Sequence, residues 1–283
     1  MKRLTWWGVL ALMLAIVVSL VGAGCGDDSN DSGSSSSVAT LEKGTLKVGS
    51  NIPFPPFEFG KAPYQGFDVD LVNEISKRLD LKAEFIKTPF AAIFRDLGQG
   101  RFDMVASAST ITPQREKGVD FSYPYFPANQ SLMVKKGSDI QSANDLAGKT
   151  VGAKLATTGA AYAKDETDAK TVRTYDQIDD AFDALQAGQV DAVINDFPTS
   201  QYATRARKDL VVVGEIPTGE QYGFGFKKGN DGLRNAVNKE LDKVKADGTY
   251  TKIYRKWLQT DPPESILKPG TGGSAASGTE PVK

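Results

Sequence analysis

The chain has 283 residues, of which 40% are hydrophobic and 24% are charged, and its formal net charge is -1. This composition fits a soluble globular protein of one large or two small domains, and the absence of a basic stripe argues against nucleic acid as a partner. The sequence has no His and a single Cys, Cys25, which excludes Ser-His-Asp and Cys-His catalysis, His-based metal sites and disulfide bonds. We therefore expect no catalytic residues, no metal ion and no cofactor.

Residues 1–24 have the pattern of a leader, because two cations precede an apolar run of roughly signal-peptide length that ends in small residues. Cys25 follows directly. The end of the run resembles the lipobox of bacterial lipoproteins, except that Gly22 stands where that motif usually has Leu. We predict a lipoprotein signal peptide and a lipid on Cys25 that holds the protein to the outer face of the membrane. The alternative is an uncleaved transmembrane anchor, and both alternatives place the remainder outside the cytoplasm.

Polar, small residues flank the folded part on both sides. Residues 25–40 are mostly Asp, Ser, Gly and Asn, a composition that predicts a flexible tether. The segment 261–283 includes "PGTGGSAASGTEP" and is predicted to be a disordered tail. The folded part is then about 41–260. A tether that keeps this part near a membrane suggests that it contacts a partner at the membrane.

Helix and strand patterns alternate along this folded part. "LKVGS" (46–50) predicts a short strand, and "DVDLVNEISKRL" (68–79) predicts an amphipathic helix. "KAEFIK" (82–87) alternates as a strand does, and "FAAIFRDLGQG" (90–100) predicts a helix closed by glycine. This order predicts an α/β fold with a mostly parallel sheet.

The same unit occurs twice. "FRDLGQGRFDMV" (94–105) aligns without gaps on "FDALQAGQVDAV" (182–193), and "KVGSN" (47–51) resembles "TVGAK" (150–154). A repeat of this kind predicts two similar α/β lobes. The predicted lobes are 41–131 together with 224–260, and 132–223.

Polar or small residues follow the apolar strands at four places. In chain order these are Asn51, the segment "SAST" (107–110), Lys154 with "LATTG" (155–159), and Asn195 with Asp196. Ligands of open α/β sheets bind outside the carboxyl ends of the strands. Any one of these residues alone is more often an ordinary loop polar residue, but four matched strand ends in two lobes favour a site in a cleft between them.

Arg115 lies where a helix alone would not favour a cation. Thr112 and Pro113 have the pattern of an N-cap and first helical residue, and the helix dipole is positive there. A guanidinium group suits a carboxylate. Backbone N–H groups near Thr110 and a nest at 157–159 would add donors for the same anion.

Asp196 supplies the opposite charge and suits an ammonium group. A carboxylate and an ammonium group held close together describe an α-amino acid. Phe54 and Phe90 could form apolar walls around its side chain, although each phenylalanine alone is more often a core residue.

From about residue 44 to 259 the sequence resembles the bacterial family 3 extracellular solute-binding proteins, the polar amino acid receptors of ABC importers. The matching segments are "PPFEF", "GFDVDLVNEISKRL", "GRFDMVASASTITPQREKGVDFSYPY", "DLAGKTVGAKLATTG" and "KADGTYTKIYRKW". The resemblance implies a type II periplasmic-binding-protein fold, in which two α/β lobes are joined by two crossover strands and close around the ligand. The crossover strands are expected at 131–136 and 222–228.

The resemblance also implies roles for individual residues. Arg115 matches the residue that binds the ligand carboxylate, Asp196 the one that binds its ammonium group, and Ala108 a backbone carbonyl that accepts from the ammonium. The predicted ligand-binding residues are Asn51, Phe54, Phe90, Ser107, Ala108, Thr110, Arg115, Lys154, Thr157, Thr158, Asn195 and Asp196.

Two departures from the family pattern bear on specificity. Asn51 stands where many relatives have Asp, and Lys154 resembles the glutamine-receptor pattern. Since Lys154 would repel a cationic side chain, we favour glutamine or glutamate over a basic amino acid as the ligand. The alternatives are a receptor for basic amino acids and an enzyme similar to cyclohexadienyl or arogenate dehydratase, with Glu58 or Asp196 as general acid.

The prediction is a monomeric receptor without enzymatic activity. It is expected to be anchored by lipid outside the cytoplasm and to deliver an amino acid to an ABC permease.

Overall fold

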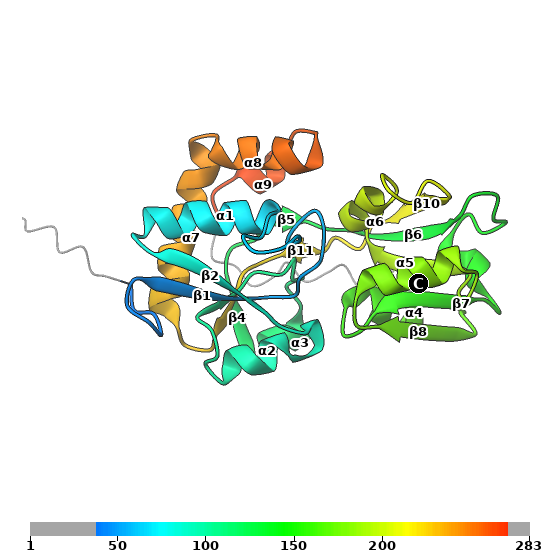
Figure 1. Ribbon diagram of the computed structural model, residues 1–283, viewed down its shortest axis with the longest axis horizontal. Coiled ribbons are helices and arrows are strands. Elements are labelled where there is room, and N and C mark those ends of the chain that lie inside the picture. Colours follow the sequence, from blue (N-terminus) through cyan, green and yellow to red (C-terminus); the bar gives the residue numbers. More distant parts are fainter. Residues whose placement is uncertain (1–37, 271–283) are drawn as a thin grey trace, which may run out of the picture. The chain divides into compact units, whose positions relative to one another are not determined.

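Two five-stranded sheets and a two-stranded ladder form the framework of the computed structural model, which describes residues 38–270 (Figure 1). The predicted signal peptide, Cys25 and most of the predicted tether lie outside the described residues. The first sheet has the order β2 (Lys82–Lys87), β1 (Thr45–Ser50), β3 (Met104–Val105), β12 (Gly225–Lys227) and β4 (Val119–Phe121). The second has the order β10 (Leu210–Ile216), β6 (Gln130–Lys135), β9 (Ala192–Asp196), β7 (Thr150–Lys154) and β8 (Thr171–Tyr175).

The helices flank these sheets, and we call each sheet with its helices the first and the second lobe. The helices of the first lobe are α1 (Phe67–Arg78), α2 (Phe90–Gly98), α3 (Pro113–Glu116), α7 (Asp231–Ala246), α8 (Thr249–Leu258) and α9 (Glu264–Leu267). Those of the second lobe are the 3-10 helix η1 (Ala143–Leu146), α4 (Thr158–Asp165), α5 (Ile178–Gln186) and α6 (Phe197–Ala203). The described residues thus form the two-lobed α/β fold that the sequence predicts.

The predicted repeat is confirmed in the arrangement of the strands. β2, β1 and β3 are parallel neighbours in the first sheet, and β8, β7 and β9 are parallel neighbours in the second. The helices α2 and α5, which carry the matching sequence, begin 88 residues apart and end 88 residues apart. Each lobe therefore presents the carboxyl ends of equivalent strands.

The prediction of a mostly parallel sheet is confirmed, because four of the five strands in each sheet run in the same direction. The exceptions are β12 in the first sheet and β6 in the second, each of which runs antiparallel to both of its neighbours. Each of these two strands enters its sheet after the chain has crossed from the other lobe.

Apart from Tyr222, the crossover strands were predicted at the wrong residues. β6 was expected to cross between the lobes, but it pairs with β9 and β10 inside the second sheet. Its apolar side chains explain this, because Leu132 and Val134 pack on one side of the sheet and Met133 on the other. A strand with apolar side chains on both faces is stable where both faces of its sheet are buried. The chain instead passes between the lobes through the short antiparallel ladder of β5 (Phe126–Pro127) and β11 (Gln221–Tyr222).

Residues 261–270, which were predicted to belong to a disordered tail, are part of the described fold. Residues 264–267 form α9, Ile266 is buried against the core of the first lobe, and the backbone N–H of Gly270 donates to Asp242 at 3.0 Å. The two apolar residues Ile266 and Leu267 pack on this core, which the polar composition around them concealed. The prediction for 271–283 lies outside the described residues.

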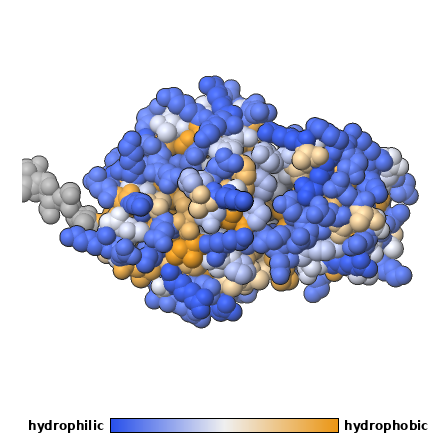
Figure 2. All heavy atoms as spheres, viewed as in Figure 1, coloured by the Kyte–Doolittle hydropathy of each residue, from blue (hydrophilic) through white to orange (hydrophobic). Residues whose placement is uncertain are grey.

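Hydrophilic residues cover most of the face seen in Figure 2. Among the large hydrophobic side chains of residues 38–270, only Leu41 and Leu155 are exposed. No helix in this part of the chain is both long enough and apolar enough to cross a membrane.

Candidate ligand-binding site

Ten of the twelve predicted site residues line one small cavity. They are Phe54, Phe90, Ser107, Ala108, Thr110, Arg115, Lys154, Thr157, Thr158 and Asp196. Most of them are the last residues of β7 and β9 or lie just after β1, β3 and β7, as the rule for strand ends predicts. The space between the side chains is about 10 Å³, room for about one water molecule and much less than an amino acid occupies.

Arg115 spans the cavity from the first turn of α3. Its Nη1 donates to the carbonyl oxygen of Thr110 at 2.7 Å, and its Nη2 donates to that of Ala156, in the second lobe, at 3.2 Å. The guanidinium carbon lies 5.2 Å from the ring centroid of Phe90. Thr112 caps the helix by accepting from the Arg115 backbone N–H. Within residues 38–270 no carboxylate oxygen lies within 4.0 Å of this guanidinium, so its charge is unpaired there.

Lys154 ends β7 and is the second cation of the cavity. It is 2% exposed, and its Nζ lies 4.2 Å from the ring centroid of Phe54 and 4.7 Å from that of Phe90. Nζ makes neither a hydrogen bond nor an ion pair with any residue of the described chain. Burial lowers the pKa of Lys154 to about 8, although the charges of Glu58 and Asp196 oppose this. Lys154 is thus a desolvated ammonium held by two aromatic rings.

Asp196 ends β9 and supplies the negative charge of the cavity. Its Oδ1 accepts from Gln130 Nε2 at 2.6 Å, and its Oδ2 accepts from the Tyr222 hydroxyl at 2.7 Å. Burial and then the charge of Glu220 raise the pKa of Asp196 to about 6, while the two hydrogen bonds act in the opposite direction. The carboxylate is therefore ionised at neutral pH, with lone pairs that a further donor can use.

A buried polar layer fixes the loop at 107–110. Ser107 Oγ donates to Glu58 Oε1 at 2.9 Å, and the backbone N–H of Ala108 donates to Asp68 Oδ2 at 2.9 Å. The Tyr125 hydroxyl donates to the same Asp68 oxygen at 2.7 Å. Ala108 has a φ of +42°, a strained conformation for a residue with a side chain. These contacts hold the backbone carbonyl and N–H groups of the loop at the cavity edge.

The two remaining predicted site residues do not line the cavity. The side-chain amide of Asn51 donates to the Thr88 carbonyl oxygen at 3.0 Å, and that of Asn195 donates to the Asp196 carbonyl oxygen at 3.2 Å. Both amides thus bind backbone beside the strand ends. Glu58, considered as a general acid, also lies outside the cavity lining, and burial raises its pKa well above the usual range.

Sequence reasoning missed three residues that contact the site from the crossover region, namely Gln130, Glu220 and Tyr222. Gln130 donates to Asp196 and to Glu220, and Tyr222 donates to Asp196. One signal was available, because Gln130 opens a run of buried apolar residues in β6 and a polar residue there requires a partner.

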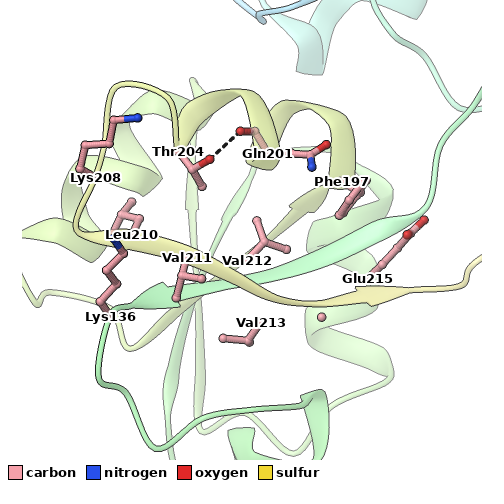
Figure 3. A pocket seen from close by; sticks show the side chains of 11 residues that line it. Lys136, Phe197, Gln201, Thr204, Lys208, Leu210, Val211, Val212, Val213 and Glu215 are labelled. Carbon is pink, nitrogen blue, oxygen red and sulfur yellow. Dashed lines mark hydrogen bonds between the residues drawn. The ribbon is translucent and has the colours of Figure 1, made fainter. Parts of the chain in front are cut away.

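A separate hollow lies between β10 and α6 in the second lobe (Figure 3). Lys136 and Lys208 lie near one end of it and Glu215 near the other, with Val212 between the strand and the helix. The Thr204 hydroxyl donates a hydrogen bond to the Gln201 carbonyl oxygen. Because the charged groups stand apart and none of the predicted site residues lines this hollow, the cavity at the strand ends is the stronger candidate site.

Known proteins resemble the chain over most of its length. The family model for bacterial extracellular solute-binding proteins, family 3, matches residues 46–260. The ABC transporter glutamine-binding protein GlnH of Bacillus subtilis (strain 168) is 36% identical over 204 residues, which are 71% of this chain and 75% of that protein.

Two solved structures support the same relationship. A structure of an ancestral arginine-binding protein bound to glutamine is 41% identical, has a TM-score of 0.74, and covers 77% of this chain and 100% of its own. The ancestral amino acid-binding protein AncCDT-1, a precursor of cyclohexadienyl dehydratase, is 40% identical with a TM-score of 0.71, and covers 76% of this chain and 96% of its own.

Proposed function

The chain belongs to family 3 of the bacterial extracellular solute-binding proteins, and we propose that it is the receptor of an ABC importer for a polar amino acid, with glutamine or glutamate as the favoured ligand. The observation that carries the proposal is the charge pattern of the cavity. Among residues 38–270, Arg115 and Lys154 face it without an ion-pair partner, and the carboxylate of Asp196 lies beside them.

Arg115 would bind the α-carboxylate of the ligand. Its guanidinium group donates to two backbone carbonyl oxygens, which are weaker partners than a carboxylate held by two parallel hydrogen bonds. A ligand carboxylate would exchange these contacts for charge-assisted ones. The stacking of the guanidinium near Phe90 keeps the group in place for this exchange.

Asp196 would bind the α-ammonium group. Its carboxylate is ionised at neutral pH and is approached by the neutral donors Gln130 and Tyr222 rather than by a cation of the described chain. A ligand ammonium would therefore bring the counter-charge that Asp196 lacks.

Lys154 would select the side chain of the ligand. Its ammonium lies between Phe54 and Phe90, so that a side-chain amide or carboxylate oxygen would find a donor at the end of an apolar slot. A guanidinium or ammonium side chain would meet a like charge in a desolvated place. This argument favours glutamine and glutamate over arginine, lysine and histidine.

Ligand entry would require the lobes to move apart. A cavity of about 10 Å³ cannot admit an amino acid, and residues of both lobes line it. A ligand that contacts both lobes binds the closed arrangement better than the open one, and this difference in affinity drives closure.

An enzyme of the dehydratase type is the second candidate function, because AncCDT-1 is a precursor of such an enzyme. Asp196 lines the cavity with a pKa of about 6 and could serve as general acid. Against this stand the two hydrogen bonds that already engage both of its oxygens. Incubation with arogenate or prephenate, followed by the absorbance of the aromatic product, tests this candidate directly.

The cellular setting of the proposal follows from the family and from the leader. We infer that a lipid on Cys25 anchors the protein outside the cytoplasm, that it acts as a monomer, and that it docks on a membrane permease. Incorporation of labelled fatty acid into the chain, lost in Cys25→Ser, tests the anchor.

Thermal melting of the ligand-stripped protein against the twenty amino acids tests the receptor function. A ligand at about 1,000 times its Kd adds roughly 4 kcal/mol to the free energy of unfolding, which for a chain of this size is a shift of about 8 to 16 °C. Glutamine or glutamate should give this shift, and Arg115→Ala should remove it while the exposed control Arg95→Ala should not. A shift with arginine or lysine would overturn the specificity, and no shift with any amino acid would overturn the receptor function.

A further inference from the structure

The carboxylate of Glu220 joins the two lobes beside the cavity. One of its oxygens, Oε2, accepts from Thr110 Oγ1 at 2.8 Å and from Thr158 Oγ1 at 2.6 Å, and Oε1 accepts from Gln130 Nε2 at 3.0 Å. Thr110 belongs to the loop after β3 in the first lobe, and Thr158 is the first residue of α4 in the second lobe. A single carboxylate therefore bridges the lobes.

The main chain of Glu220 is fixed to the crossover region and to the first lobe. Its carbonyl oxygen accepts from the Ala128 N–H at 2.8 Å, next to the ladder of β5 and β11. The following residue, Gln221, accepts from the Ile111 N–H at 2.9 Å, and Gly223 donates to the Ser109 carbonyl oxygen at 3.1 Å. If the second lobe swings away, Glu220 stays with the loop that carries Thr110, and its contacts with Thr158 and Gln130 of the second lobe break.

Glu220 acts on the cavity without lining it. Thr110 and Thr158 both line the cavity, whereas Glu220 does not. A threonine hydroxyl has a single proton, and in both residues that proton goes to Glu220. Each hydroxyl is therefore held in one orientation, and the Thr158 oxygen also accepts from Gln130 Nε2 at 3.2 Å.

We propose that Glu220 is a latch that stabilises the closed arrangement of the lobes through Thr110 and Thr158 and positions these two side chains for the ligand. The proposal deepens the proposed receptor function and rests on it for the opening and closing of the lobes. Glu220 is a positioning residue, because it reaches the ligand site only through the two threonines.

Distances between spin labels on the two lobes test the latch without any ligand. The full chain carries Cys25→Ser and two new cysteines for labelling, Gln99→Cys after α2 and Asp165→Cys in α4, both at exposed positions. A hydrogen bond to a charged group that is lost on opening changes the ratio of closed to open molecules by about tenfold or more. Glu220→Ala should therefore shift the ligand-free distance distribution towards longer values.

Three further variants make the test specific. Thr158→Val should lengthen the distances in the same direction as Glu220→Ala does, and the double variant should add nothing beyond Glu220→Ala, because that variant already removes the bridge to Thr158. Glu215→Ala is the matched control, since Glu215 is exposed on β10 and accepts from Asn129 alone, and it should leave the distribution unchanged. Glu220→Gln keeps the shape of the side chain and guards against misfolding of the alanine variant; it should give a smaller shift in the same direction.

The outcomes separate the latch from the receptor function. Unchanged distances in both Glu220 variants, or additive effects of Glu220→Ala and Thr158→Val, would overturn the latch. Titration with L-glutamine as the probe should give binding about tenfold weaker in Glu220→Ala than in the parent chain, and equal affinities would count against the latch as well. If the parent chain binds no amino acid, the receptor function fails on that result, while the label distances decide the latch independently.

Discussion

Replacement of Lys154 by methionine should stabilise the ligand-free protein. Burial lowers the pKa of Lys154 from 10.5 to about 8, a difference of about 2.5 that corresponds to about 3.5 kcal/mol at about 1.4 kcal/mol for each pKa unit. Contacts of the ammonium with the rings of Phe54 and Phe90 offset about 1 to 2 kcal/mol of this desolvation cost. The charge therefore costs about 1.5 to 2.5 kcal/mol at neutral pH, and a methionine packed on the same rings does not carry this cost.

The pH dependence gives a second and sharper signature. Between pH 8 and 10.5 the Lys154 side chain is protonated in the unfolded chain and has lost its proton in the folded one. The unfolded state then binds more protons, so the contribution of Lys154 to the free energy of unfolding rises with pH through this window. The difference in stability between Lys154→Met and the parent should therefore be largest near pH 7 and shrink towards pH 10.

Thermal unfolding of the ligand-stripped proteins between pH 7 and pH 10 measures both effects. Near pH 7 we expect the melting temperature of Lys154→Met to be about 3 to 10 °C higher than that of the parent, at about 2 to 4 °C for each kcal/mol in a domain of this size. Lys87→Met, at an exposed position on β2, is the matched control and should change little. A less stable Lys154→Met, or a difference that stays constant with pH, would refute the reasoning that this ammonium is buried for the ligand.

Three further outcomes are expected. The pKa of Asp196 is raised to about 6, so its carboxyl group takes up a proton below that pH and loses the charge that pairs with an ammonium group. Amino acid binding measured by calorimetry should therefore be about tenfold weaker at pH 5 than at pH 7. A Kd that is the same at both pH values would contradict the assignment of Asp196. Arg115→Ala should reduce amino acid affinity at least 100-fold, because it removes the proposed contact with the ligand carboxylate. The circular dichroism spectrum should stay unchanged, since the charge of Arg115 has no ion-pair partner within residues 38–270. Unfolding of this variant would indicate a structural role instead. Ile266→Ala should lower the free energy of unfolding by about 2 kcal/mol and leave the ligand affinity unchanged, because Ile266 is 3% exposed and packs on the core of the first lobe. An unchanged free energy of unfolding would mean that α9 does not pack as described.

The sequence allowed the cavity to be located because its residues follow repeated, apolar strands. The repeat places Lys154 at the end of β7 and Asp196 at the end of β9, in positions equivalent to the strand ends of the first lobe. Parallel strands that end together bring their following residues together. Short-range pattern and topology were thus sufficient for the residues that stand on strand ends and helix starts.

The residues that sequence reasoning missed are placed by long-range pairing. Glu220 and Tyr222 contact residues of the cavity because the segment 220–223 lies beside 109–111 and pairs with β5, and nothing in a local pattern indicates that register. The same limitation misplaced the crossover strands, since the membership of β6 in the second sheet depends on its partners β9 and β10. Asn51 shows the opposite error, because a residue at the right strand end can still turn its side chain to the backbone, here to Thr88.

The charges of the cavity fit the proposed binding of an amino acid better than they fit a role in the stability of the free protein. Arg115 and Lys154 face the cavity without an ion-pair partner in the described chain, and Asp196 accepts from uncharged donors although two cations lie nearby. A chain that needed only a stable core would gain by pairing these groups or by replacing them with apolar residues. Two separate cations and one carboxylate in the same desolvated space are best compensated by one molecule that carries an ammonium group, a carboxylate and an additional oxygen acceptor. Such a molecule restores all three interactions at once, and the energy that the free protein loses at each charge becomes part of the preference for the closed, ligand-bound state.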